Sequence, residues 1–160
     1  MTNWRSLFQS HFDSTKTRDE LTELQLLPGA QIPHIQSIVS QLGFDTSEEF
    51  LELYSTFNGV GHKQGENELD WFKQLSSLEE FGESCRMWME DHEEVSTRYF
   101  PFIDFNNGES AGYMHDENGN RLEGIFFHYT GAYEYDEDQP WTEFIVKENQ
   151  SIEEFLKECS

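Results

Sequence analysis

Apolar residues recur at helical spacing after four short sequences of the form Ser/Thr-x-x-Glu, a signature of a helix N-terminus. After the second of these, the apolar positions are Phe50, Leu53, Tyr54 and Phe57. A further apolar face spans about residues 33–42, with Pro33 in its first turn and Gly43 just past its end. We predict a helix at each of these places. The four capping pairs are Thr17 with Glu20, Thr46 with Glu49, Ser77 with Glu80, and Ser151 with Glu154.

The pattern changes after about residue 98, where short runs rich in aromatic and β-branched residues are separated by turn residues. Asn107-Gly108 and Asn118-Gly119 divide residues 99–129 into three segments, YFPFIDF, SAGYMHD and LEGIFFHY. Asn-Gly between apolar runs is a strong hairpin signal because both residues tolerate positive φ. We therefore predict an antiparallel meander, with a fourth strand over residues 141–147.

Together these elements predict an α+β fold, in which N-terminal helices pack on a curled antiparallel β-sheet and a C-terminal helix closes the structure. The chain of 160 residues has the size of one ordinary domain and contains no repeat or linker-like segment. We expect a single domain over residues 1–160. Trp, Tyr and Phe make up 15 % of the chain, so large rings should fill much of the core.

The net charge of the chain restricts the kinds of partner that it can bind. Ten Lys and Arg residues face 32 Asp and Glu residues, a net charge of −22. Direct binding to nucleic acid or to an anionic membrane needs a basic surface, so both are excluded as direct partners. A basic protein partner is favoured instead, although a strongly acidic surface also serves solubility alone.

The remaining sequence signals point to the cytoplasm. The two cysteines lack metal-ligand spacing, and the N-terminus lacks a signal-peptide pattern. No apolar run has the length of a membrane span. We expect a soluble, cytoplasmic protein.

One motif suggests a serine hydrolase. Residues 108–112 match Gly-x-Ser-x-Gly around Ser110, and Asp116 and His128 follow in the appropriate order. That chemistry needs the serine on a sharp turn between a strand and a helix. Here the residues after Ser110 have a strand pattern that leads into a hairpin, so a structural role is favoured and hydrolysis is the weakest functional alternative.

Metal sites are disfavoured by spacing. His92-Glu93 would need a second histidine at position 96, where Ser96 stands. The Asx-rich turns that begin at Asp104 and Asp116 lack the glycine and glutamate of a calcium-binding loop. We predict no catalytic residue, metal or cofactor.

The acidic segment between Tyr99 and Val146 is the best candidate binding surface. It holds ten acids, and Arg121 is its only Lys or Arg. A charge run is often only a solvated loop. Acids steer a basic partner, however, and interleaved aromatic residues are common anchors at interfaces. The candidate partner-binding residues are Asp104, Glu109, Asp116, Glu117, Tyr133, Glu134, Tyr135, Asp136, Glu137, Asp138 and Trp141.

Residues 49–59, EFLELYSTFNG, resemble the most recognisable segment of the SUKH superfamily, the SMI/KNR-like proteins. Gln41-Leu42-Gly43 ahead of it, the YFPFID segment and the terminal SIEEFL helix are also similar, so the resemblance covers most of residues 20–158. The proline usual before the Phe50 helix is absent. The family-motif residues, which the resemblance implies to be structural, are Tyr54, Phe57, Asn58, Gly59 and Pro101.

The resemblance implies a non-enzymatic protein. Bacterial members are mostly immunity proteins that bind and neutralise a toxin domain, often a nuclease, whereas fungal relatives regulate cell-wall synthesis. Our leading hypothesis is an immunity protein whose acidic surface occupies the basic cleft of a cognate toxin. The alternatives are an intracellular regulatory scaffold and a serine hydrolase that uses Ser110.

Overall fold

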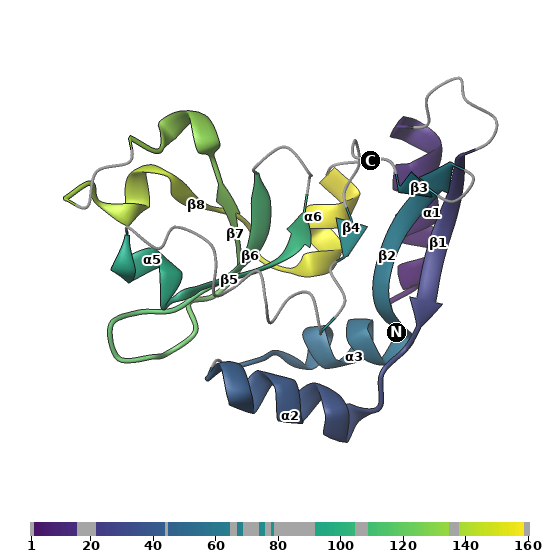
Figure 1. Cartoon of the computed structure of the whole chain (residues 1–160), viewed down its shortest axis with the longest axis horizontal. Helices are drawn as coiled ribbons and strands as arrows, with labels where there is room; N and C mark the ends of the chain where they lie inside the picture. The colour runs from purple at the N-terminus through teal and green to yellow at the C-terminus, as the bar shows by residue number, and fades with distance from the viewer. Residues whose placement is uncertain are drawn as a thin grey trace.

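A computed structural model gives the chain an α+β architecture, which confirms the predicted fold class (Figure 1). The strands form one antiparallel sheet in the order β1 (Thr22–Pro28), β2 (Phe57–Gln64), β4 (Gln74–Leu75), β5 (Tyr99–Asp104), β6 (Ser110–Met114), β7 (Ile125–His128) and β8 (Ile145–Asn149). The short β3 (Asn67–Glu68) pairs with β2 outside this order. The C-terminal helix is present as predicted. The structure describes residues 2–15, 22–43, 45–64, 67–68, 74–75, 78, 92–104, 109–134 and 138–158.

Two of the helices in the first half agree with the sequence pattern. Helix α2 (Ile32–Leu42) has Pro33 in its first turn and ends at Gly43, whose φ of 76° is the left-handed conformation that favours glycine. Helix α3 (Glu48–Thr56) buries Phe50, Leu53 and Tyr54. A third helix, α1 (Trp4–Thr15), was not predicted.

The N-cap of α3 differs by one residue from the prediction. Ser47, rather than Thr46, is the cap, because its Oγ accepts the backbone N–H of Phe50 at 3.1 Å. The same Oγ lies 2.7 Å from the hydroxyl of Tyr113. The start of α3 is therefore tied to the sheet through one serine.

The first half of the chain also supplies strands, which the sequence pattern did not predict. Strand β1 (Thr22–Pro28) pairs antiparallel with β2 (Phe57–Gln64). The prediction of a helix after Thr17 and Glu20 is therefore wrong for residues 22–28, which form β1. The pair itself lies outside the described residues. The strand forms because Leu24 and Leu26 alternate and pack against the core. The short strands β3 (Asn67–Glu68) and β4 (Gln74–Leu75) complete this part of the sheet.

The predicted meander is confirmed. Strands β5 (Tyr99–Asp104), β6 (Ser110–Met114) and β7 (Ile125–His128) pair antiparallel in chain order. The fourth strand, β8 (Ile145–Asn149), begins later than predicted. The start of the expected strand is instead a 3-10 turn, η2 (Trp141–Glu143), in which the Trp141 ring packs on Phe126 at a centroid distance of 6.3 Å. A similar turn, η1 (Thr130–Ala132), follows β7.

Helix α6 (Ile152–Glu158) begins directly after Ser151, as the fourth capping pair predicted. The Oγ of Ser151 accepts the Glu154 N–H at 3.1 Å, and the Glu154 carboxylate accepts the N–H of Gln150. The helix predicted after Ser77 lies outside the described residues except for Leu78, which is buried.

Two hydrophobic clusters stabilise the fold on opposite faces of the β5–β8 part of the sheet. Successive strand residues point to opposite faces, so Ile125 joins the larger cluster and Phe126 the smaller one. The larger cluster takes side chains from α1, α2, α3 and α6. The smaller is covered by α5 (Glu93–Ser96) and residues 130–144. Its buried members are Val95, Tyr99, Met114, Phe126, Tyr133, Phe144 and Ile145.

Candidate functional site

Two shallow hollows share Glu94, a residue of the short helix α5. The first measures about 470 Å³ and the second about 420 Å³. We call the surface around them the Glu94 surface. The first is lined by Glu94, Thr97, Arg98, Asp116, Glu117 and Gly119, and the second by Glu94, Asp138, Gln139, Pro140, Trp141 and Thr142.

The Glu94 surface unites part of the predicted acidic segment. Asp116 and Glu117 come from the turn between β6 and β7, whereas Asp138 and Trp141 come from the segment between η1 and β8. Glu94, from α5, joins the two groups, although it lies outside the segment from Tyr99 to Val146. Sequence reasoning missed it because its place in the surface depends on the packing of α5 against the sheet.

Asp116 organises the turn that carries it. Its Oδ1 accepts the backbone N–H groups of Asn118 and Asn120, both at 2.9 Å. These bonds, the Asn120 N–H foremost, hold the pKa of Asp116 below its usual value. Gly119, with φ 82°, closes the turn that the Asn-Gly pair predicted. The carboxylate therefore stays ionised on the surface at neutral pH.

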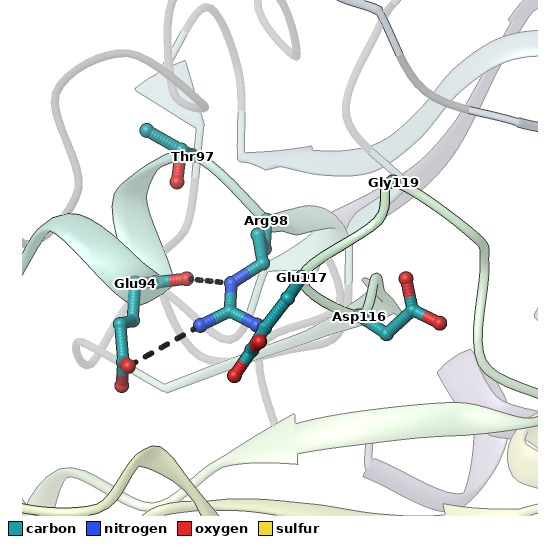
Figure 2. A pocket seen from close by; sticks show the side chains of 6 residues that line it. All are labelled: Glu94, Thr97, Arg98, Asp116, Glu117 and Gly119. Carbon is teal, nitrogen blue, oxygen red and sulfur yellow. Dashed lines mark hydrogen bonds and ion pairs between the residues drawn. The ribbon is translucent and has the colours of Figure 1, made fainter.

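Arg98 brings a cation into this acidic surface. Its Nε donates to the backbone oxygen of Glu94 at 3.1 Å, and its guanidinium lies 3.5 Å from the Glu94 carboxylate. In Figure 2 the guanidinium reaches toward Glu94 while the Asp116 carboxylate points away from it. Arg121, the cation within the predicted segment, lines neither hollow and lies 5.0 Å from the ring centroid of Tyr113.

Gln139 joins described residues on either side of the acidic run. Its side-chain amide contacts the backbone at both Ala132 and Glu134, at 2.8 Å and 2.9 Å. Its own backbone oxygen lies 2.8 Å from Nε2 of His92. Both Gln139 and His92 are buried. Sequence reasoning missed this pair because glutamine and histidine in a polar stretch carry no distinctive spacing.

The other predicted partner-binding residues lie in different environments. Tyr133 is only 8 % exposed and packs on Phe144 at a centroid distance of 4.7 Å, so most of its ring belongs to the core. Glu134 is exposed. Asp104 and Glu109 lie at the end of the β5–β6 hairpin opposite to Asp116, since Tyr99 pairs with Met114 and Asp104 with Ser110. Tyr135, Asp136 and Glu137 lie outside the described residues.

Ser110 lies in a strand rather than on a nucleophile elbow. It begins β6, is 3 % exposed, and its Oγ lies 3.2 Å from the hydroxyl of Tyr99. His128 is its partner in the sheet register, but Asp116 follows the opposite end of β6. Gly112 faces Pro101 in that register, and a Cβ at this glycine would overlap the carbonyl oxygen of Phe100. Close packing of two strands thus explains the second glycine of the Gly-x-Ser-x-Gly motif.

Among the residues that the structure describes, no group of three or more His, Cys, Asp or Glu side chains could hold a metal ion. Likewise, none of the helices among these residues is both long and apolar enough to cross a membrane.

Two of the family-motif residues, Tyr54 and Phe57, belong to the larger hydrophobic cluster rather than to the smaller one beneath α5. Tyr54 and Phe57 are buried, and the side-chain oxygen of Asn58 accepts the N–H of Leu78 at 2.8 Å. Gly59 adopts a φ of 118° just after α3 ends, which a residue with a side chain rarely adopts. Asn58-Gly59 therefore lies within β2, directly after the helix, and Pro101 lies in β5.

The model of the SMI1/KNR4 family (SUKH-1) matches residues 29–158, a span that contains the motif residues and both hollows. The chain belongs to this family. No curated protein sequence matches the chain significantly. In this SUKH-1 protein the motif residues shape the core, while the two hollows share Glu94 of α5, the short helix that packs over the smaller hydrophobic cluster.

Proposed function

We propose that this SUKH-1 protein is a non-enzymatic, cytoplasmic immunity protein, folded as one domain over residues 1–160, that neutralises a cognate toxin by binding it through the Glu94 surface. Membership of the family supports a role in immunity or regulation through protein–protein interaction. The observation that carries the proposal is the convergence of four acids and Trp141 on two hollows that share Glu94.

The charge of the chain favours a basic toxin. A nuclease cleft is built to hold phosphates, and a protein of net charge −22 is electrostatically suited to occupy it. The half-buried Trp141 ring offers an apolar anchor beside Asp138 in the second hollow. The acids would set the rate of encounter, and the aromatic anchor would set the lifetime of the complex.

Co-expression tests the proposal. The proposal predicts that an upstream gene encodes a large secreted chain with a toxic C-terminal domain, and this domain is the toxin to use. We expect the wild-type protein to protect cells that express this domain. A triple variant, Glu94→Lys, Glu117→Lys and Asp138→Lys, should fail to protect.

The matched control reverses three exposed acids elsewhere, with Asp13→Lys, Glu48→Lys and Glu158→Lys. These residues line neither hollow and change the net charge equally. Equal protection by both triple variants would contradict the proposed surface. The association rate of the wild-type protein with the toxin should also fall steeply as ionic strength rises.

The alternative is a regulatory scaffold of the cell-wall-synthesis type. It predicts several intracellular partners and no protection against any toxin. The same co-expression experiment, followed by identification of proteins that co-purify with the chain, separates the two functions.

A further inference from the structure

One side chain joins the two described ends of the acidic loop, residues 132–134 and 138–139. The amide Nε2 of Gln139 donates to the backbone oxygen of Ala132 at 2.8 Å, and Oε1 accepts the N–H of Glu134 at 2.9 Å. Gln139 is 6 % exposed, and both bonds are partly buried. A buried side-chain amide that loses its partners is costly, so the bonds favour the observed proximity of these two ends.

The buried side chain of His92 binds the backbone of Gln139. Its Nε2 lies 2.8 Å from the backbone oxygen of Gln139, and because a carbonyl only accepts, Nε2 carries the proton. The His92 ring is 1 % exposed and lies edge-on to Phe144, at a centroid distance of 5.4 Å. The bond therefore joins Gln139 to a ring that packs on Phe144 of the smaller cluster, directly before the short helix α5 that carries Glu94.

The bonds of Gln139 affect how residues of the Glu94 surface are arranged. Glu134 and Asp138 are exposed members of this loop, and Trp141 follows two residues after Gln139. A surface whose acids are already ordered loses less conformational entropy when a partner binds. We propose that Gln139, held by His92, is the positioning residue of the Glu94 surface. It fixes the two described ends of the loop so that Asp138 and Trp141 present one arrangement to a cationic partner. This inference rests on the proposed function.

The first measurement uses the free protein. Gln139→Met keeps the length of the side chain and removes both of its hydrogen bonds. We expect the Glu134 amide hydrogen to exchange at least ~10-fold faster in this variant, because its acceptor is lost. His92→Phe keeps an aromatic ring and removes only the bond to the Gln139 backbone, so it should also accelerate this exchange. The control is Gln150→Met, at an exposed glutamine outside the loop, which should leave the exchange rate unchanged.

The second measurement uses an immobilised peptide of six arginines as the cationic probe. Gln139→Met leaves the net charge unchanged, so the association rate should stay within about twofold of wild type, whereas the dissociation rate should rise roughly 5–10-fold. A residue that only stabilised the fold would lower the melting temperature without this effect on dissociation. Glu94→Lys with Asp138→Lys provides the reference, and it should lower the association rate.

The outcomes separate this inference from the proposed function. If the double reversal weakens binding but Gln139→Met dissociates like Gln150→Met, the positioning role is overturned and the proposed surface stands. Unchanged exchange of the Glu134 amide in Gln139→Met would likewise overturn it. If the double reversal binds the peptide as well as wild type does, the proposed surface fails, and the positioning role fails with it.

Discussion

The Glu49 carboxylate of α3 accepts two backbone N–H groups at the start of α6. One oxygen lies 2.7 Å from the nitrogen of Ile152 and the other 3.1 Å from that of Glu153. The first N–H groups of a helix have no partner within it, and a negative charge there is favoured by the helix dipole. The sequence pattern had assigned Glu49 to the start of its own helix, yet its carboxylate caps a helix 103 residues later in the chain.

This contact predicts a specific loss of stability. Glu49→Ala removes both acceptors from the end of α6, so we expect the free energy of unfolding to fall by about 1–2 kcal/mol, measured by urea denaturation. Glu48→Ala, at the exposed neighbouring position, is the control and should change it by less than about 0.5 kcal/mol. Equal losses in the two variants would mean that the cap contributes nothing.

Gly112 gives a second stability prediction. A Cβ at this position would overlap the Phe100 carbonyl and the Pro101 backbone of the paired strand, neither of which is free to move. Gly112→Ala should therefore lower the free energy of unfolding by about 3 kcal/mol. Gly131→Ala is the matched control, because a Cβ there would have no neighbour within 4 Å. A tolerated Gly112→Ala would show that β5 and β6 separate more easily than this packing allows.

His115 predicts a dependence of stability on pH. Its Nδ1 donates to the backbone oxygen of Arg98 at 3.1 Å, and its Nε2 accepts the N–H of Asp45 at 3.3 Å, which requires the neutral ring. Burial is the main cause that lowers the pKa of His115 below its usual 6.5, and Arg121 acts in the same direction. The Arg98 carbonyl and the carboxylates of Asp45 and Asp116 oppose this shift.

Because the folded pKa is the lower one, the unfolded chain takes up the proton first as pH falls below about 6.5. The stability due to neutral His115 is present above that pH and is lost as pH falls toward the folded pKa. We expect wild type to lose more free energy of unfolding between pH 7.5 and 5.5 than His115→Asn does. His34→Asn, at an exposed histidine, should follow wild type. If His115→Asn shows the wild-type pH slope, this linkage is absent.

Ser110 predicts an absence of serine-hydrolase reactivity. Its hydroxyl is buried beside Tyr99 within β6, so a fluorophosphonate probe should not label it. Mass spectrometry of the treated protein measures this. Stoichiometric labelling that Ser110→Ala abolishes would revive the hydrolase alternative.

The excess of acids predicts a response to salt. With a net charge of −22, repulsion between like charges should lower the melting temperature at low ionic strength. Raising the salt concentration to 0.1 M shortens the Debye length to about 10 Å, so we expect the melting temperature to rise. A calorimetric scan in which salt has no effect, or lowers the melting temperature, would show that the acids are already well dispersed.

Local signals in the sequence predicted much of the fold. The N-terminal proline and C-terminal glycine of α2, the capping pair of α6 and the Asn118-Gly119 turn act within a few residues, so they are readable from the chain. The pairing of β1 with β2 joins segments 42 residues apart at Thr22 and Gln64, the ends of their register. Leu24 and Leu26 show the alternation of this strand, but only the partner strand decides between strand and helix.

The candidate site likewise combines features that the sequence predicted with features that only the tertiary structure shows. Composition alone determined that the chain is strongly acidic and that a basic partner is favoured, because net charge is a sum over residues and does not depend on where they lie. Tertiary structure alone decided which acids gather around Glu94, that Arg98 lies among them, and that Tyr133 is mostly buried. Those facts depend on packing between distant segments, such as the bond from His92 to Gln139 across 47 residues, and no local pattern along the chain encodes such a contact.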